Sequence, residues 1–192
     1  MARPKQFDPD TATQEAMEAF WEHGYFATSV NDLLAEMGLN RGSLYGTFKD
    51  KKTLFLAALD KYAEQVAGEI GAILDAPSVR DAIRDLLREA AKRARGEEGR
   101  RGCLAGKAAL EMAPHDADIG DWVRRFHERK VELVEQTIRR GQRQGEIDPS
   151  VDARATARFL LNGMAGLHLL GTIAPDEAEV QDVVRSILKA LD

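Results

Sequence analysis

The residues best suited to bind a partner lie close together between positions 41 and 52. They provide one guanidinium that can donate two parallel hydrogen bonds, several hydroxyl groups, a glycine that lets a partner approach the backbone, and a cluster of lysines. Clustered cations and hydroxyls are suited to phosphates, whereas a guanidinium can reach base edges. The pattern therefore indicates nucleic-acid recognition. In order, the residues are Arg41, Gly42, Ser43, Tyr45, Thr47, Lys49, Lys51 and Lys52.

Two short helices are expected to position these residues. Apolar side chains recur at helical spacing over residues 29–37, and Ser29 with Asp32 resembles a capping box at the start of this helix. Gly38 can end the first helix in a left-handed conformation, and Asn40 can cap a second helix over residues 41–48. Two short helices joined by a turn containing glycine form a helix-turn-helix pattern. From spacing alone, a helical hairpin with a solvated charged face remains an alternative.

The segments TSVNDLL, MGLNRGSLY and FKDKKTL, which span residues 28–54, resemble the N-terminal signature of the TetR/AcrR family of bacterial transcriptional repressors. The resemblance covers about the first third of the chain. It implies that Arg41 reads base edges and that Ser43, Tyr45 and Thr47 contact phosphates. It also implies phosphate contacts from Thr28 and Lys51 and a DNA contact from Asn31. Gly46 and Thr47 replace larger residues that are common in the family, so the resemblance implies the docking mode but does not define the target sequence.

The chain has 192 residues and a net charge of −5, which does not by itself suggest a nucleic-acid binder. Residues 1–55 hold six Lys and Arg against eight Asp and Glu, so the DNA hypothesis depends on where the cations lie, including Arg3 and Lys5 in the N-terminal arm. A single cysteine excludes an intrachain disulfide and fits a reducing cytosol. The longest apolar run, around residues 159–170, is too short and interrupted to span a bilayer. We therefore expect a cytoplasmic protein without a membrane segment.

Helical signals continue to the end of the chain, without a strand pattern or an internal repeat. About nine helices are expected, which makes the fold all-α. We predict a helix-turn-helix domain over residues 1–53 and a ligand-binding and dimerisation domain over residues 54–192. The expected helices after the first three cover residues 50–74, 78–95, 103–114, 116–145, 150–171 and 176–191, and residues 96–102 are expected to form a charged loop.

The last two helices suggest a homodimer. The segment 159–170 is apolar nearly all round and contains Gly163 and Gly166, which would let another helix approach closely. The last helix carries an unbroken apolar stripe. A buried helix within a monomer explains the pattern equally well, but the family resemblance implies a four-helix bundle formed by two chains.

No set of residues suggests catalysis. The four histidines fall in different segments, and no HExxH or repeated ExxH pattern supplies metal ligands. Asp116 and Asp118 with His115 and Glu111 resemble a metal site on paper, but an acidic helix start explains them better. We expect no catalytic residues, no metal site and no cofactor.

A ligand pocket is predicted among helices that would face one another. Its lining would be mostly apolar, as is typical of small-molecule sites; each residue could equally be plain core. The predicted lining residues are Leu86, Leu87, Cys103, Met112, Trp122, Phe126, Phe159, Met164 and His168.

Cys103 falls at a predicted helix start near Arg100, Arg101 and Lys107, where a thiolate would be favoured. The segment GCLAGKAALEMAPHD resembles a branch of the TetR/AcrR family in which some members release DNA when this cysteine is modified. The alternative, that Cys103 is a small buried packing residue, is the one we favour from sequence.

Together with these patterns, the family resemblance implies a homodimeric repressor of a near-palindromic operator in double-stranded DNA. A small, mostly apolar ligand or an electrophile would release it, with the helix over residues 50–74 as the moving lever. The alternative is an α-helical enzyme or small-ligand carrier with an incidental helix-turn-helix.

Overall fold

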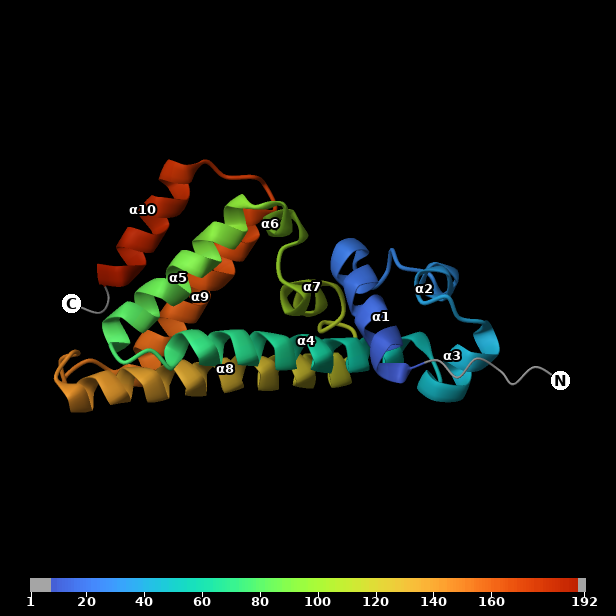
Figure 1. Cartoon of the computed structure of the whole chain (residues 1–192), viewed down its shortest axis with the longest axis horizontal. Helices are drawn as coiled ribbons and strands as arrows, with labels where there is room; N and C mark the ends of the chain where they lie inside the picture. Colours follow the sequence, from blue (N-terminus) through green and yellow to red (C-terminus); the bar gives the residue numbers. More distant parts are fainter. Residues whose placement is uncertain (1–7, 190–192) are drawn as a thin grey trace.

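A computed structural model describes residues 8–189, apart from the side chain of Glu98. Over this range the chain forms ten helices and no strand (Figure 1), which confirms the all-α class. The arm that carries Arg3 and Lys5 lies outside the described residues. The helices are α1 (Pro9–His23), α2 (Val30–Glu36), α3 (Arg41–Phe48), α4 (Lys51–Leu74), α5 (Val79–Arg95), α6 (Glu97–Arg101), α7 (Leu104–Glu111), α8 (Ala117–Gln144), α9 (Ala153–Gly171) and α10 (Glu177–Leu188).

Local capping signals set most of the helix ends. Ser29 and Asp32 form the expected capping box at the start of α2, because each side chain accepts from the other residue's backbone N–H. Gly38 follows α2 with a φ of 58°, and Gly145 ends α8 in the left-handed conformation. These signals lie within a few residues of the ends that they fix, so the sequence reveals them directly.

The expected charged loop over residues 96–102 is wrong, because Glu97–Arg101 form the short helix α6. Gly99 lies so close to the end of α5 that an added Cβ would be 2.6 Å from the carbonyl oxygens of Arg93 and Ala94. Gly171 of α9 meets Gly99 from the other side, where an added Cβ would lie 2.9 Å from the Gly99 carbonyl oxygen. Helical periodicity in the sequence could not predict this contact between Gly99 and Gly171, because the two residues lie far apart in the chain.

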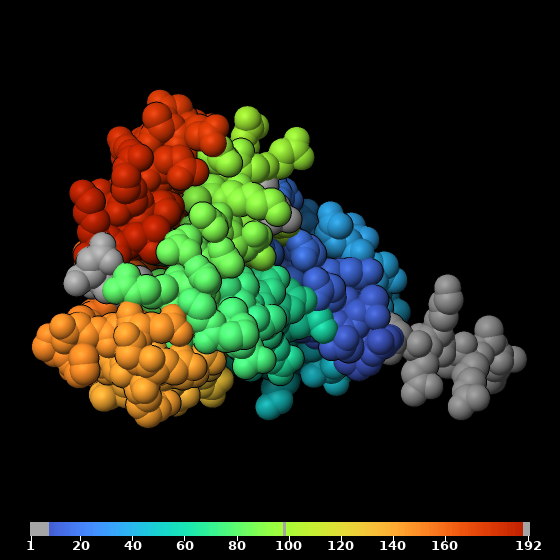
Figure 2. Space-filling model, turned by 60° about the vertical axis from the view of Figure 1, so that its left-hand side comes forward, coloured from blue at the N-terminus to red at the C-terminus, as the bar shows by residue number. Residues whose placement is uncertain are grey.

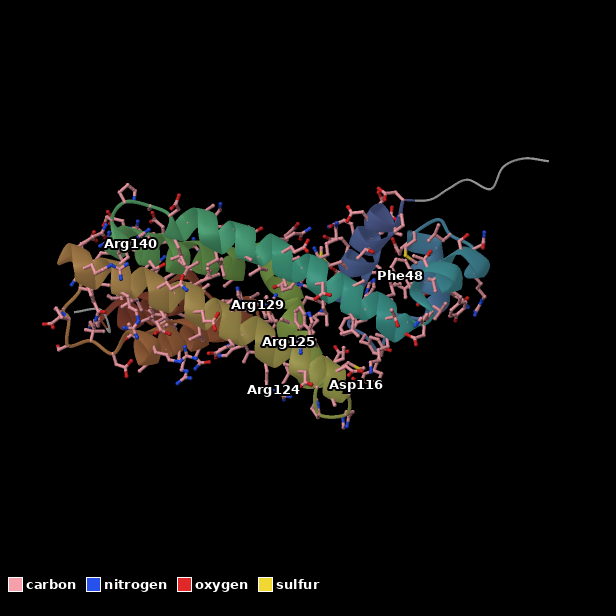
Figure 3. All side chains as sticks on the ribbon, turned by 90° about the horizontal axis from the view of Figure 1, so that it is seen from below. Phe48, Asp116, Arg124, Arg125, Arg129 and Arg140 are labelled. Carbon is pink, nitrogen blue, oxygen red and sulfur yellow. The ribbon has the colours of Figure 1, made fainter. Side chains whose placement is uncertain are left out.

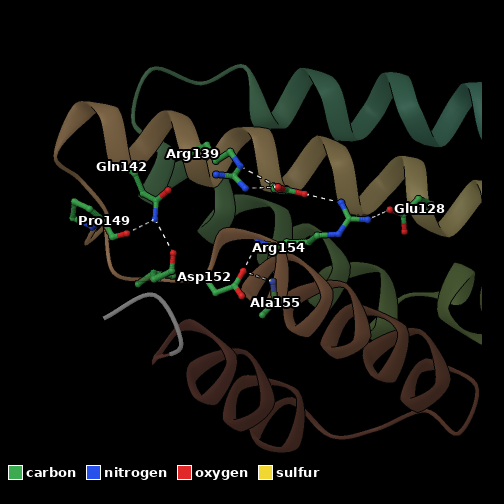
Figure 4. Close-up of polar contacts among 9 residues, drawn as sticks. Glu128, Arg139, Gln142, Pro149, Asp152, Arg154 and Ala155 are labelled. Carbon is green, nitrogen blue, oxygen red and sulfur yellow. Dashed lines mark hydrogen bonds and ion pairs between the residues drawn. The ribbon is translucent and has the colours of Figure 1, made fainter.

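Helix α9 begins later than expected, at Ala153 rather than near Ser150. Asp148 accepts from the Ser150 N–H and holds a turn, and Asp152 then caps α9 (Figure 4). Gln142 near the end of α8 donates to the Val151 carbonyl oxygen at 2.8 Å. Arg154 connects α9 back to α8 through Glu128 and Glu135 (Figure 4). The α8–α9 corner is therefore fixed by polar contacts at both of its ends.

The molecule has two apolar cores joined by the long helices. Helices α4 and α8 run side by side along its length, with α1–α3 at one end and α5, α9 and α10 toward the other (Figure 1). In a space-filling view, α10 likewise lies far from the N-terminal helices (Figure 2). The N-terminal core also takes side chains from α7 and from the first half of α8, among them Leu104, Met112 and Trp122. In the described part of the chain, no helix combines the length and apolar character needed to cross a membrane.

Candidate nucleic-acid interface and central cavity

Three buried side chains fix the orientation of the helix-turn-helix. Leu33 of α2 and Leu44 of α3 are fully buried, and Phe48 is nearly so. Since these residues face the N-terminal core, the opposite side of α3 is open. Arg41, Gly42, Tyr45 and Thr47 are exposed along α3, and Ser43 is half-buried. The exposed surface of α3 thus carries five of the residues predicted to contact DNA.

Arg41 and Asn31 lie together on this face. The Arg41 Nη2 atom donates to the Asn31 Oδ1 atom at 2.8 Å, so the side chain of α2 holds the guanidinium at the start of α3. The helix cap comes from Asn40, whose Oδ1 accepts from the Ser43 N–H at 2.9 Å. An arginine that is already oriented loses less freedom when it meets a base edge. Asn31, which is itself exposed, therefore positions the Arg41 side chain.

The phosphate contacts expected from Thr28 and Lys51 do not fit their positions. The Thr28 side chain is 1% exposed, and its hydroxyl donates to the Gly24 carbonyl oxygen at 2.7 Å. The Lys51 ammonium donates to the Tyr25 carbonyl oxygen and lies 4.1 Å from the centre of the Tyr25 ring. Burial lowers the pKa of Lys51, against the raising effects of Glu111 and Asp32. Both side chains stabilise the turn before α2. The sequence indicates that a hydroxyl and an ammonium are present but not that they bind backbone carbonyl oxygens of this turn.

Lys52 connects the start of α4 with the start of α8. Its ammonium lies 2.7 Å from carboxylate oxygens of both Asp116 and Asp118. Asp116 also accepts from the Asp118 and Ile119 N–H groups and so caps α8, at the tip labelled in Figure 3. The hydrogen bond from Lys52 lowers the pKa of Asp116, against a smaller opposing effect of burial. Within the described residues, no group of three or more His, Cys, Asp and Glu side chains is arranged to hold a metal ion.

Helix α7 makes a second polar connection to the N-terminal helices. The Lys107 ammonium donates to the carbonyl oxygens of Trp21 and Glu22 at the end of α1, at 2.6 and 3.1 Å. One turn later, the Glu111 carboxylate accepts from the Tyr25 N–H at 2.9 Å and, more weakly, from the Phe26 N–H at 3.4 Å. Sequence reasoning missed this connection. The only signal was a lysine and a glutamate at i and i+4, a spacing usually explained by a local pair.

A cavity of about 530 Å³ lies between α4, α5, α7, α8 and α9. This volume is within the range of about 300–1,000 Å³ found for sites that enclose small organic molecules. Five of the nine predicted lining residues belong to its wall: Leu86, Cys103, Phe126, Met164 and His168. The wall also contains residues that sequence reasoning did not select, notably Trp21, Tyr62, Ile70 and Lys130.

The other four predicted lining residues lie elsewhere. Leu87 is buried in the core formed by α5, α8, α9 and α10. Met112 and Trp122 belong to the N-terminal core, where the Trp122 indole N–H donates to Asp60 at 2.7 Å. Phe159 is 50% exposed on the outer side of α9. Helical periodicity identified these residues as apolar positions but could not tell which core or face each one joins.

Cys103 stands at the start of α7 and in the wall of the cavity. Its Sγ atom lies 3.3 Å from the Tyr62 hydroxyl oxygen. Burial by itself would raise the pKa of the thiol, but hydrogen bonds from His168 and Tyr62 and the positive charges of His168 and Lys130 lower it to about 6. The expected cations act elsewhere, since Arg101 pairs with Glu18 and Glu22. The neighbours that favour the thiolate come from α4, α8 and α9.

Comparisons with known proteins agree with this geometry. Residues 13–58 match the family model described as bacterial regulatory proteins, tetR family, and residues 79–187 match the Tetracyclin repressor-like, C-terminal domain. The chain belongs to the TetR family of transcriptional regulators. It is 34% identical over 194 residues to the uncharacterized HTH-type transcriptional regulator YezE of Bacillus subtilis (strain 168), with 100% of both chains covered.

Two further similar proteins carry more specific descriptions. The HTH-type transcriptional repressor ComR of Escherichia coli (strain K12) is 34% identical over 160 residues, with 82% of this chain and 76% of ComR covered. A cysteine mutant of the TetR family regulator CifR, solved with 26 bp double-strand operator DNA, superimposes with a TM-score of 0.88 at 32% identity over 100% of both chains. TetR-family proteins are DNA-binding transcriptional regulators and not enzymes. The enzyme alternative is thereby excluded.

Proposed function

We propose that this protein is a homodimeric repressor that binds a near-palindromic operator in double-stranded DNA in the cytoplasm. The exposed face of α3 carries the proposal, because Arg41 is held there by Asn31 with Tyr45 and Thr47 beside it. In a two-fold dimer, two such helices would enter successive major grooves about 34–36 Å apart. The operator complex of the similar CifR protein supports the same mode of docking.

The outer face of α9 supports the dimer. Its inner residues, such as Leu160 and Leu167, are buried within the chain, yet Phe159 remains 50% exposed. Large exposed apolar side chains on one helix are typical of an interaction surface. Gly163, which was expected at the seam between chains, instead packs against Ile187 of α10 in the same chain, where an added Cβ would lie 2.4 Å from the Ile187 Cδ1 atom. We therefore assign the seam to the Phe159 side of α9.

A small ligand, or an electrophile that modifies Cys103, would release the operator from within the central cavity. Two helices lead from this cavity to the DNA-binding end. Helix α4 passes through the cavity wall at Tyr62 and begins beside α3, so it remains our proposed lever. Helix α7 carries Cys103 at one end and the Lys107 and Glu111 contacts to α1 and the following turn at the other. A displacement of α7 would therefore reach the helix-turn-helix directly.

Operator binding tests the proposal. DNA fragments retained by the purified protein would be sequenced, and the shared site would then be titrated at several salt concentrations. Arg41→Ala is expected to weaken operator binding by about 1–3 kcal/mol and to relax specificity at one base position in each half-site. Arg185→Ala on the exposed side of α10 is the matched control and should bind like the natural protein. Unchanged operator affinity in Arg41→Ala would contradict α3 as the reading helix.

A further inference from the structure

The positively charged side chains of the cavity wall differ in whether the chain provides them with hydrogen-bond acceptors. Its arginines and lysines are Arg93, which pairs with Glu69 and Glu89; Arg101, which pairs with Glu18 and Glu22; Lys107, which donates to backbone carbonyl oxygens of α1; and Lys130. Lys130 differs from the other three. Among the described residues, no carboxylate or carbonyl oxygen lies within hydrogen-bond distance of its ammonium.

The surroundings of Lys130 are mostly apolar. Its Nζ atom lies 4.6 Å from the centre of the Phe126 ring, one turn earlier on α8. Burial lowers the pKa of Lys130, and the only opposing influence is the negative charge of Cys103. Lys130 is half-buried, and its ammonium has no acceptor from the chain, so an anion beside it would gain a charge-assisted hydrogen bond in surroundings that screen charge less than water does. The chain itself supplies no oxygen acceptor to Lys130, and an anionic ligand bound in the cavity would supply one.

We propose that the central cavity binds a small organic carboxylate, with a carboxylate oxygen accepting a hydrogen bond from Lys130 and the apolar body lying along Ile70, Leu86 and Met164. This inference rests on the proposed function, in which the same cavity receives the effector. A carboxylate fits better than a phosphate ester, because phosphate sites supply several donors whereas this wall offers one unpaired cation. A ligand that is apolar apart from one anionic end matches the composition of the wall.

The proposal links ligand binding to the chemistry of Cys103. Within the chain, Cys103 is the group whose negative charge acts on Lys130. A carboxylate on Lys130 places a second negative charge beside the sulfur, so Cys103 takes up a proton and becomes a less reactive thiol. The other titratable side chains in the cavity wall besides its lysines and arginines are Tyr62, Glu69, Glu89, His127 and His168. Carboxylate binding above pH 6 is therefore expected to consume a proton and to slow alkylation of Cys103.

Matched acids and amides test the proposal on the intact protein. The probes are octanoate and octanamide, 4-phenylbutyrate and 4-phenylbutyramide, and benzoate and benzamide, titrated by calorimetry and by thermal shift. At least one acid is expected to bind about 10- to 100-fold more tightly than its amide, the range for a hydrogen bond to a charged group. No binding by any acid, or equal affinity within every pair, would overturn the proposal without the need for a variant.

Variants then assign the preference to Lys130. Lys130→Met keeps the packing on Phe126 and should lose the preference for the acid, whereas Lys130→Arg should keep it. Lys92→Met, on the exposed side of α5, is the matched control. A preference that survives in Lys130→Met would refute the assignment to this residue. As a second readout, the bound acid should slow maleimide alkylation of Cys103 more than its amide does, and equal protection by both would also count against the proposal.

These tests are independent of operator binding. Lys130 lies on α8, away from the exposed face of α3, so the natural protein and the Lys130 variants should bind the operator alike without ligand. A protein that binds carboxylates but no DNA would refute the proposed function and leave the cavity assignment intact. A protein that binds the operator but no carboxylate would refute only the proposed ligand class.

Discussion

Removing the Cys103 thiol should change how the stability of this protein depends on pH. The pKa of the thiol falls from an ordinary value of 9.0 to about 6 in the folded chain. Because the folded pKa is the lower one, folding favours the thiolate. The resulting stability is fully present above the unfolded pKa, decreases below it, and is lost once the pH falls through about 6. Cys103→Ser lacks this contribution at every pH.

The size of the effect follows from the shift. A thiol whose pKa falls from 9.0 to about 6 on folding contributes on the order of 4 kcal/mol at pH 9 and above, and on the order of 2 kcal/mol near pH 7.5. Near pH 6 the contribution is a few tenths of a kcal/mol. Between these limits, the difference between natural protein and variant should increase by about 1.4 kcal/mol for each pH unit.

Urea denaturation at pH 6, 7, 8 and 9, at one protein concentration, measures this difference. Cys103→Ala serves as a second variant, since it differs from serine in size and hydrogen bonding but also lacks an ionisable group. Both variants should therefore show the same pH dependence relative to the natural protein, even if their absolute stabilities differ. A constant difference across the four pH values would refute a stabilised thiolate and the influence of His168 and Lys130 on it.

Three further outcomes are expected. Phe159→Glu should yield a folded monomer in sedimentation at micromolar concentration, because it places a charge in the proposed dimer interface. A variant that remains a dimer would show that the interface does not include this side of α9. Glu111→Gln should lower the free energy of unfolding by about 1–2 kcal/mol, through weaker acceptance from the Tyr25 N–H, and should reduce the effect of a ligand on operator affinity. Lys49→Met should reduce the slope of log operator affinity against log salt concentration by about 1, because Lys49 is exposed and can reach a phosphate. Lys51→Met should leave this slope unchanged, because the Lys51 ammonium is bound to the Tyr25 carbonyl oxygen. Equal slopes for the two variants would contradict the structural role of Lys51.

The sequence predicted structural features best where the interacting residues lie close together in the chain. Ser29 and Asp32 lie three residues apart and form the capping box that starts α2. Leu44 and Phe48 lie four residues apart and are both buried, whereas Arg41 is exposed at the first position of α3. The orientation of the helix-turn-helix therefore follows from local spacing, and the family signature adds to it.

The sequence was least informative where side chains separated by many residues meet. Lys52 reaches Asp116 and Asp118, and Lys107 reaches carbonyl oxygens at the end of α1; neither contact has a local signature. The same limit applies to Phe159. Helix α9 is apolar on two sides, and periodicity cannot tell which side faces the cavity. Lys130 was overlooked because a lysine on a charged helix normally faces solvent.

The shared N-terminal core has a practical consequence for hybrid regulators. Leu104, Met112 and Trp122 fill the space beneath α1–α4, although they lie far along the chain from the helix-turn-helix. A gene fusion that joins residues 1–53 to the body of another family member would place foreign side chains in that space. Recognition modules should therefore exchange well only between relatives that match at these positions, or when α7 and the first half of α8 are transferred with them.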